Sequence, residues 1–203
     1  MPRPPRIRAP GAYYHVFNRG VECRPIVDDD RDRRMLLRFL GRALQQHGAR
    51  LFAYCLMDNH YHLFLQTADA NLDLVMRDFQ GRYVQYFNLA HDRVGPLFQG
   101  RYQSPLVQVD AYALQVTRYI HRNPVEAGLI TAAALQEYRW SSYPSYTGRL
   151  PRWPWLDTEW ILTQFHQDVA QALKLFVAFH QVPGGPGPLG TVAHRPSAAS
   201  CAP

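Results

Sequence analysis

The chain has 203 residues, of which 47% are hydrophobic and 13% aromatic, so it can build a folded globular core. Its apolar runs are short and interrupted by charge, and none follows the basic N-terminus, so we expect neither a membrane span nor a secretory signal. The net charge is +6, which favours a polyanionic partner such as nucleic acid. These features predict a cytoplasmic protein.

The first predicted element is a strand at residues 12–20, where side chains alternate before an Asn-Arg-Gly turn. Three aspartates from Asp28 to Asp30 then precede leucines at helical spacing. This pattern predicts a helix with an acidic N-terminal cap that stops near Gly48. Two apolar strands follow at 49–57 and 60–66, and the short Asp-Asn turn between them predicts a hairpin.

A second helix is predicted at 71–91, and a fourth strand at 101–109, where Pro105 indicates an edge position or a bulge. Asp110 is placed to cap a third helix, which Pro124 is expected to end. The order β-α-β-β-α-β-α predicts an α+β fold with a ferredoxin-like antiparallel sheet. A further helix is expected at roughly 157–181, and the Gly- and Pro-rich residues 183–203 are expected to be disordered.

His60 and His62 are the first candidates for chemistry. Residues two apart on a strand point to the same face, so both imidazoles can reach one cation. Spacing alone favours a simpler interpretation, in which two histidines on a sheet face are satisfied by hydrogen bonds.

Tyr119 and Asn123 form a second pair, four residues apart on the third predicted helix and facing the same way. The Asn carbonyl oxygen suits a hard cation such as Mg²⁺ or Mn²⁺, and a tyrosine beside that ligand can attack a phosphorus atom held there. The alternative is a tyrosine in the core and an asparagine that caps the helix before Pro124.

Five segments in order together resemble a known family. They are AYYHVFNRG (12–20), DNHYHLFL (58–65), VGPLFQGRY (94–102), YIHRNPVEAGLI (119–130) and WSSY (140–143). In this combination the chain resembles the REP-associated tyrosine transposases, a branch of the single-tyrosine HUH endonucleases. The resemblance covers roughly residues 10–148. Two positions depart from the family pattern: Asp58, where proline is common, and Tyr61, where an aliphatic residue is common.

The resemblance implies a role for each matching residue. His60 and His62 match the metal-binding pair, Tyr119 the nucleophile, and Asn123 the polar residue that completes the metal site, with Mg²⁺ or Mn²⁺ as cofactor. The implied reaction is cleavage and rejoining of single-stranded DNA through a 5′-phosphotyrosine link, on REP-like hairpins flanked by a short guide sequence. The expected organisation is a catalytic domain at 1–148, a helical extension at 149–182 and a tail at 183–203, in a bacterial, nucleoid-associated monomer or homodimer.

DNA binding is expected to combine arginines on phosphates with aromatic rings stacked on unpaired bases. The basic N-terminal arm, with Arg3, Arg6 and Arg8, could follow a groove when DNA binds or could stay disordered. The alternative for each candidate arginine is a solvated surface charge, and for each candidate tyrosine a place in the core. The candidates are Arg19, Arg82, Arg93, Arg101, Arg118 and Arg122 for phosphates, and Tyr14, Tyr83 and Tyr102 for stacking.

Three other functions fit parts of the pattern. A ferredoxin-like sheet can bind single-stranded RNA without a metal, although this chain lacks a clear RNP1 motif and the histidine pair would then have no role. A metal-dependent hydrolase would use water as its nucleophile and leave Tyr119 structural. A domesticated transposase would keep DNA binding and lose transposition.

Overall fold

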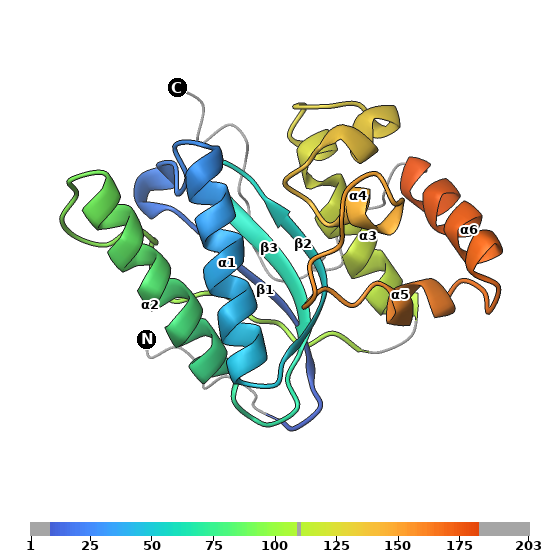
Figure 1. The fold of residues 1–203 in the computed structure, drawn as a ribbon, viewed down its shortest axis with the longest axis horizontal. Helices are drawn as coiled ribbons and strands as arrows, with labels where there is room; N and C mark the ends of the chain where they lie inside the picture. The colour runs from blue at the N-terminus through green and yellow to red at the C-terminus, as the bar shows by residue number, and fades with distance from the viewer. Residues whose placement is uncertain (1–8, 109–110, 183–203) are drawn as a thin grey trace.

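The computed structural model describes residues 9–108 and 111–182 (Figure 1). Its sheet contains β1 (Tyr13–Arg19), β2 (Arg50–Leu56) and β3 (His60–Gln66), paired antiparallel in the order β1-β3-β2. A short 3-10 turn, η1 (Val21–Cys23), follows β1. The predicted first strand and hairpin are therefore confirmed. β3 lies between the other two strands, so the histidine pair is carried by the central strand of the sheet.

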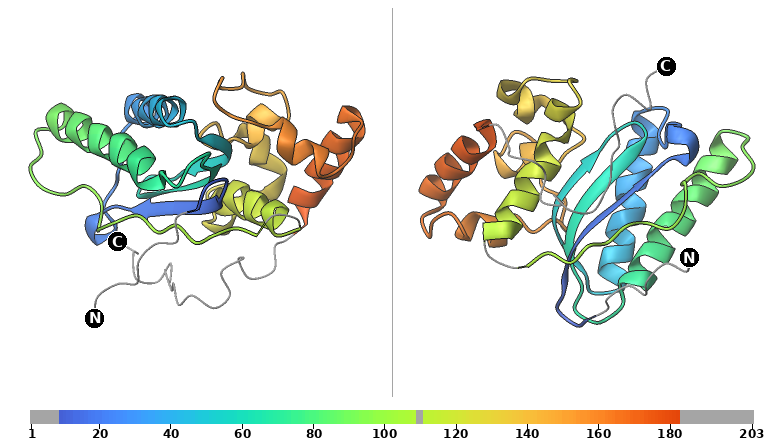
Figure 2. Two further views of the ribbon diagram at one scale, coloured as in Figure 1. Left: turned by 90° about the horizontal axis from the view of Figure 1, so that it is seen from below. Right: turned by 180° about the vertical axis from the view of Figure 1, so that it is seen from behind.

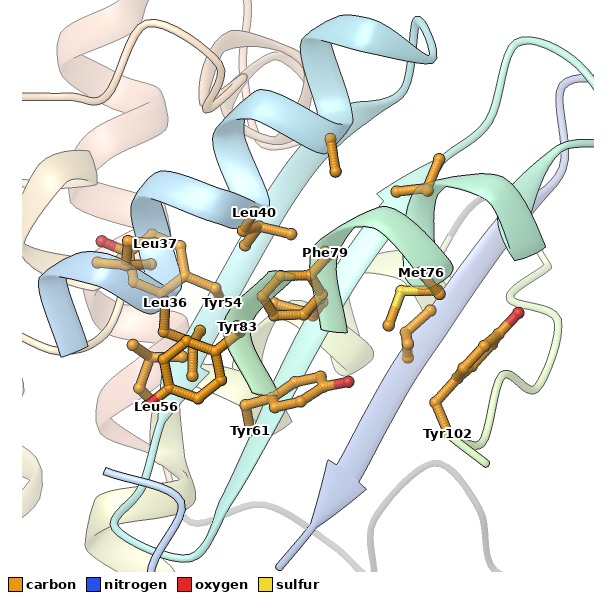
Figure 3. Packing of buried hydrophobic residues seen from close by; sticks show 14 of the residues in the cluster. Leu36, Leu37, Leu40, Tyr54, Leu56, Tyr61, Met76, Phe79, Tyr83 and Tyr102 are labelled. Carbon is orange, nitrogen blue, oxygen red and sulfur yellow. The ribbon is translucent and has the colours of Figure 1, made fainter. Parts of the chain in front are cut away.

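Helices α1 (Asp30–Gln46) and α2 (Leu72–Ala90) cover one face of the sheet (Figures 1 and 3). The predicted acidic cap is present: the Asp29 side chain accepts a hydrogen bond from the Asp32 N–H at 2.8 Å. Leu40, Phe79 and Tyr61 meet in the core beneath these helices. Because side chains alternate along β3, the residues next to Tyr61 point to the opposite face.

The opposite face is covered by α3 (Ala111–Glu126) and by short elements that follow it, as Figure 2 shows from two sides. A β-bulge between Leu51 and Ala53 turns both Phe52 and Ala53 toward this second core. The later elements are η2 (Ala132–Glu137), α4 (Tyr143–Tyr146), α5 (Glu159–Thr163) and α6 (Val169–Gln181). The two helices of the extension, α5 and α6, therefore pack on the side of the sheet that carries the histidine pair.

The predicted fourth strand does not form a regular strand. Phe17 and Gln103 exchange two backbone hydrogen bonds, of 3.1 and 2.9 Å, and the His15 N–H donates to the Pro105 carbonyl at 3.1 Å. Pro105 has no N–H to return that bond, so the ladder breaks there into isolated bridges. The segment still lies along β1, which gives the four-segment strand order of a ferredoxin-like sheet.

Two helix boundaries also differ from expectation. Pro124 lies inside α3, because it removes a single helical bond and the next turn is closed by the Ala127 N–H on the Asn123 carbonyl at 2.9 Å. The helix predicted at 157–181 is two helices, α5 and α6, because Asp168 starts a new one by accepting from the Gln171 N–H at 2.9 Å. The predictions for Asp110, residues 183–203 and most of the N-terminal arm lie outside the described residues.

Candidate active site

The two histidines of β3 lie on the face covered by α3. Their ring centroids are 5.2 Å apart; His62 is buried and His60 half-buried. Phe17 of β1 and Cys55 of β2 lie opposite His62 in the two ladders. Strands on both sides therefore hold the pair, and the shared face that the sequence predicts is confirmed.

Hydrogen bonds define which ring nitrogens are open. The Nδ1 atom of His60 is 2.7 Å from Oδ1 of Asn59, and Nδ1 of His62 is 3.0 Å from Nε2 of His15. Burial lowers the pKa of His60, so its ring is neutral at pH 7 and carries one N–H. The shorter bond, to Asn59, takes that N–H, which leaves the Nε2 lone pair of His60 open.

Asn123 meets this lone pair from α3. Its Nδ2 donates to the Tyr119 carbonyl at 3.0 Å, which turns Oδ1 toward Nε2 of His60 at 3.4 Å. In the tautomer with hydrogen on Nδ1, two acceptor atoms face each other here; in the other tautomer Nε2–H donates to Oδ1 of Asn123. A cation can satisfy both acceptor atoms, so this donor set of imidazole nitrogen and amide oxygen fits a divalent metal.

Tyr119 lies one turn before Asn123 and packs edge-on against two histidines. Its ring centroid is 5.5 Å from that of His62 and 5.6 Å from that of His15. Burial raises the pKa of the Tyr119 phenol, and the hydrogen bond with Asn123 partly offsets that rise. The structure thus brings together all four residues of the predicted site.

His15 belongs to the same cluster, although it was not among the site residues predicted from the sequence. It is 1% exposed, and burial lowers its pKa to about 3. A metal-binding imidazole commonly uses its second nitrogen to hold a partner that orients the ring, and His15 is such a partner for His62. The signal was available: alternation along residues 12–20 places His15 on one face with Phe17, but the register between β1 and β3 is needed to see that it reaches His62.

The two departures from the family pattern have local explanations. Asp58 lies at the hairpin turn, is 68% exposed, and pairs with Arg33 of α1, which offsets its negative charge. Tyr61 points to the other face, where its hydroxyl accepts a 2.8 Å hydrogen bond from Gln80 of α2. Neither side chain displaces a residue of the site.

A second group of metal-ligand types lies beneath the opposite face, at the start of α1 and the end of α2. The ligand atoms of Asp28, Asp32 and His91 lie within 4.8 Å of one another. Both ring nitrogens of His91 already contact carboxylates, at 3.3 Å to Asp28 and 2.9 Å to Asp32, and the Tyr86 hydroxyl donates to Asp32 at 3.0 Å. This group could hold a metal ion. Its hydrogen bonds, however, already join the start of α1 to the end of α2. Tyr119 lies on the other side of the sheet.

The predicted phosphate-binding arginines fall into three groups by exposure. Arg82 and Arg101 are exposed, whereas Arg19, Arg93 and Arg118 are half-buried against Gln99, Phe87 and Phe179 respectively. Arg122 is buried; it donates to the His180 carbonyl at 2.8 Å and pairs with Glu126 at 3.1 Å. Arg122 is therefore engaged within the protein in this conformation.

The three predicted stacking tyrosines are core residues, which corrects that prediction. Tyr14 is 1% exposed, Tyr83 0% and Tyr102 7%. Tyr14 points from β1 toward α1 and α2, and the Tyr83 hydroxyl donates to the Ile26 carbonyl at 2.5 Å. Their rings therefore offer no open face to a base.

Comparison with known proteins places the chain among the transposases. A sequence profile described as "Transposase IS200 like" matches residues 9–123, more than half of the chain, and this range includes His60, His62, Tyr119 and Asn123. The chain therefore belongs to the IS200-like transposase family. None of the curated proteins matches it. No helix among residues 9–108 and 111–182 is both long and apolar enough to span a membrane.

Solved structures similar to the chain include two described as transposases. A REP-associated tyrosine transposase bound to a REP hairpin has a TM-score of 0.57 and 15% identity, over 73% of this chain and 87% of that one. A putative transposase from Deinococcus radiodurans has a TM-score of 0.42 and 19% identity, over 60% of this chain and 97% of that one. The first likeness confirms the fold class.

Proposed function

We propose that this transposase is a metal-dependent endonuclease and strand-transfer enzyme that cuts and rejoins folded single-stranded DNA through Tyr119. The observation that carries the proposal is the approach of two possible metal-ligand atoms, Nε2 of His60 and Oδ1 of Asn123, to 3.4 Å, one helical turn from Tyr119. An open cation position beside a tyrosine suits phosphoryl transfer better than a binding role.

The residues of the site have separate roles in this proposal. His60, His62 and Asn123 would hold Mg²⁺ or Mn²⁺, and a bound ion supplies charge that polarises the scissile phosphate. His15 orients His62 through the 3.0 Å bond between the two rings. Burial on the sheet face keeps these imidazoles neutral, as ligands must be.

Tyr119 performs the covalent step. Its phenolic oxygen forms a bond to phosphorus while the bond between phosphorus and the 3′ oxygen breaks, and the proton lost by the phenol is balanced by the one gained by the 3′ hydroxyl. One phosphodiester replaces another, so the link stores the energy for rejoining and no ATP is needed. Burial raises the pKa of Tyr119, so the phenol must lose its proton during the attack.

The proposed substrate is a REP-like DNA hairpin with a short guide sequence. Two observations support it: the solved structure of similar fold is bound to a REP hairpin, and the chain is basic, with Arg82 and Arg101 exposed. Phosphate contacts by exposed arginines supply affinity without sequence selectivity. We propose that the hairpin shape and the unpaired guide supply the selectivity.

The test uses a folded single-stranded DNA from the neighbourhood of the gene, incubated with Mn²⁺ or Mg²⁺ and run on a denaturing gel. The proposal predicts a covalent protein–DNA species with the wild type, none with Tyr119→Phe, and none when EDTA removes the metal. Tyr112→Phe is a matched control because this second α3 tyrosine lies two turns from Tyr119. Cleavage that persists in Tyr119→Phe would identify a hydrolase, and binding without cleavage a DNA-binding or domesticated protein.

A further inference from the structure

A chain of buried hydrogen bonds runs from the sheet through α3 to α6, away from the proposed active site. The Tyr54 N–H of β2 donates to Oγ of Ser142 at 2.9 Å, and this oxygen is 2.7 Å from Nε2 of His121. Nδ1 of His121 is 3.0 Å from Nε2 of His180, whose Nδ1 is 2.8 Å from the Phe176 carbonyl. Ser142, His121 and His180 are all fully buried.

The donor and the acceptor of each hydrogen bond in this network follow from the Phe176 carbonyl at its end. A carbonyl only accepts, so Nδ1 of His180 carries hydrogen and its Nε2 is an acceptor. His121 must therefore donate from Nδ1 and accept at Nε2. The Ser142 hydroxyl has two acceptors in reach, Nε2 of His121 at 2.7 Å and the Tyr54 carbonyl at 3.3 Å, and its one hydrogen goes to the nearer. Each group is satisfied with both rings neutral, and both rings are fully buried.

This hydrogen-bond network holds α3, the helix that carries the nucleophile. His121 is two residues beyond Tyr119 and points away from it, toward α6. Figures 1 and 2 show α3 between the sheet and α6. At the sheet end of the network, Tyr54 precedes Cys55 in β2, and Cys55 lies opposite His62 of β3. The network therefore ties α3 to the sheet beside the histidine pair.

Two arginines of α3 reinforce the contact with α6. Arg122 donates to the main-chain carbonyl of His180 at 2.8 Å, and the Arg118 guanidinium lies 4.3 Å from the centre of the Phe179 ring. Both residues flank Tyr119 in sequence. The outer side of the last turns of α3 is thus held by one short stretch of α6, residues 179 and 180.

We propose that α6 is a positioning element for the nucleophile, in which His180 fixes α3, and with it Tyr119, through His121. The inference rests on the function proposed above and gives the extension at 149–182 a role in the chemical step. His121 and His180 are positioning residues, because they act through α3 and do not touch the reacting atoms. A displacement of about 1 Å at a reacting group can cost on the order of 100-fold in rate.

The test compares His180→Leu with His180→Gln in the full chain. The glutamine amide oxygen can accept the hydrogen bond from His121 in place of Nε2, whereas leucine cannot. Leu175→Ala is the control, because Leu175 is on α6 and 46% exposed. Two properties are measured on the hairpin DNA: the affinity, and the rate of covalent linkage per bound protein at saturating DNA. Amide hydrogen exchange over residues 117–123 is measured without DNA.

In His180→Leu we expect a covalent linkage rate at least about tenfold lower than in the wild type, with DNA affinity changed by less than about twofold. Amide hydrogen exchange in α3 should be faster in this variant. His180→Gln should recover most of the linkage rate. A purely structural role would lower the amount of binding-competent protein and leave the rate per bound protein unchanged. That result, or unchanged exchange, overturns the inference.

Two controls keep this test separate from the test of function. If the wild type forms no covalent species, the proposed function fails, and hydrogen exchange alone then decides whether His180 holds α3. If His180→Leu does not fold, Phe179→Ala removes the ring beside Arg118 and probes the same contact. It should lower the linkage rate in the same direction, and an unchanged rate contradicts the inference.

Discussion

Acidification from pH 7 to pH 5 should destabilise the fold measurably through His180. This side chain is fully buried, and its pKa is lowered to about 3. Burial is the main cause; the Phe176 carbonyl opposes it, and the charges of Arg118 and Arg122 contribute to the fall. His121 of α3 also faces it. In the unfolded chain a histidine has a pKa of about 6.5.

Stability falls with falling pH because the unfolded state binds the proton at a higher pH than the folded state does. Between about pH 6.5 and pH 3 the unfolded chain is protonated at this position and the folded protein is not. The stability contributed by neutral His180 is therefore complete above pH 6.5 and is lost as the pH falls. At pH 5 the loss for this one residue is about 2 kcal/mol, from 1.36 kcal/mol per pH unit.

Urea unfolding followed by tryptophan fluorescence measures this loss. The wild type and His180→Gln are compared at pH 7 and pH 5, so that the contributions of His15 and His62 cancel between the two proteins. The wild type should lose about 2 kcal/mol more than the variant between these pH values. Equal losses in both proteins would refute the claim that His180 is neutral and desolvated.

Three further predictions concern the metal site and the docking of the extension. Asn123→Ala should weaken Mn²⁺ binding by about 10- to 100-fold, measured by calorimetry, because one oxygen donor is lost beside His60; unchanged affinity would remove Asn123 from the site. His15→Leu should weaken Mn²⁺ binding by about tenfold with DNA affinity retained, because the His62 ring loses its orienting partner; wild-type metal affinity would contradict that role. Gly41→Ala should lower the free energy of unfolding by about 1–3 kcal/mol, because a Cβ at this position of α1 would lie 2.1 Å from Nε1 of Trp155. In that experiment Gly81→Ala is the control, since nothing lies within 4 Å of a Cβ there.

The periodicity of the sequence was sufficient to predict three strands of the sheet, the first three helices and the shared face of His60 and His62. These features depend on local alternation, which a single strand or helix displays by itself. A fourth strand was predicted at 101–109, with Pro105 at an edge or a bulge, but the missing N–H of Pro105 breaks its ladder into isolated bridges. The helix end predicted at Pro124 was also wrong, because tertiary packing outweighed the loss of one bond.

The features that were missed depend on contacts between distant segments. His15 reaches His62 only through the β1–β3 register, and His121 meets His180 across 59 residues. Tyr14 and Tyr83 were predicted to stack on bases because their type suits that role, but the direction of a side chain depends on which face is covered. A single sequence contains no direct signal for these pairings.

The proposed link between DNA and Tyr119 is tested most directly by locating the bond itself. The covalent species is digested with trypsin and nuclease, and the nucleotide-bearing peptide is sequenced by mass spectrometry. We predict a nucleotide joined through its 5′ phosphate to Tyr119 and a free 3′ hydroxyl on the released DNA. A 3′-phosphate link, or attachment to any other residue, would contradict the proposed mechanism.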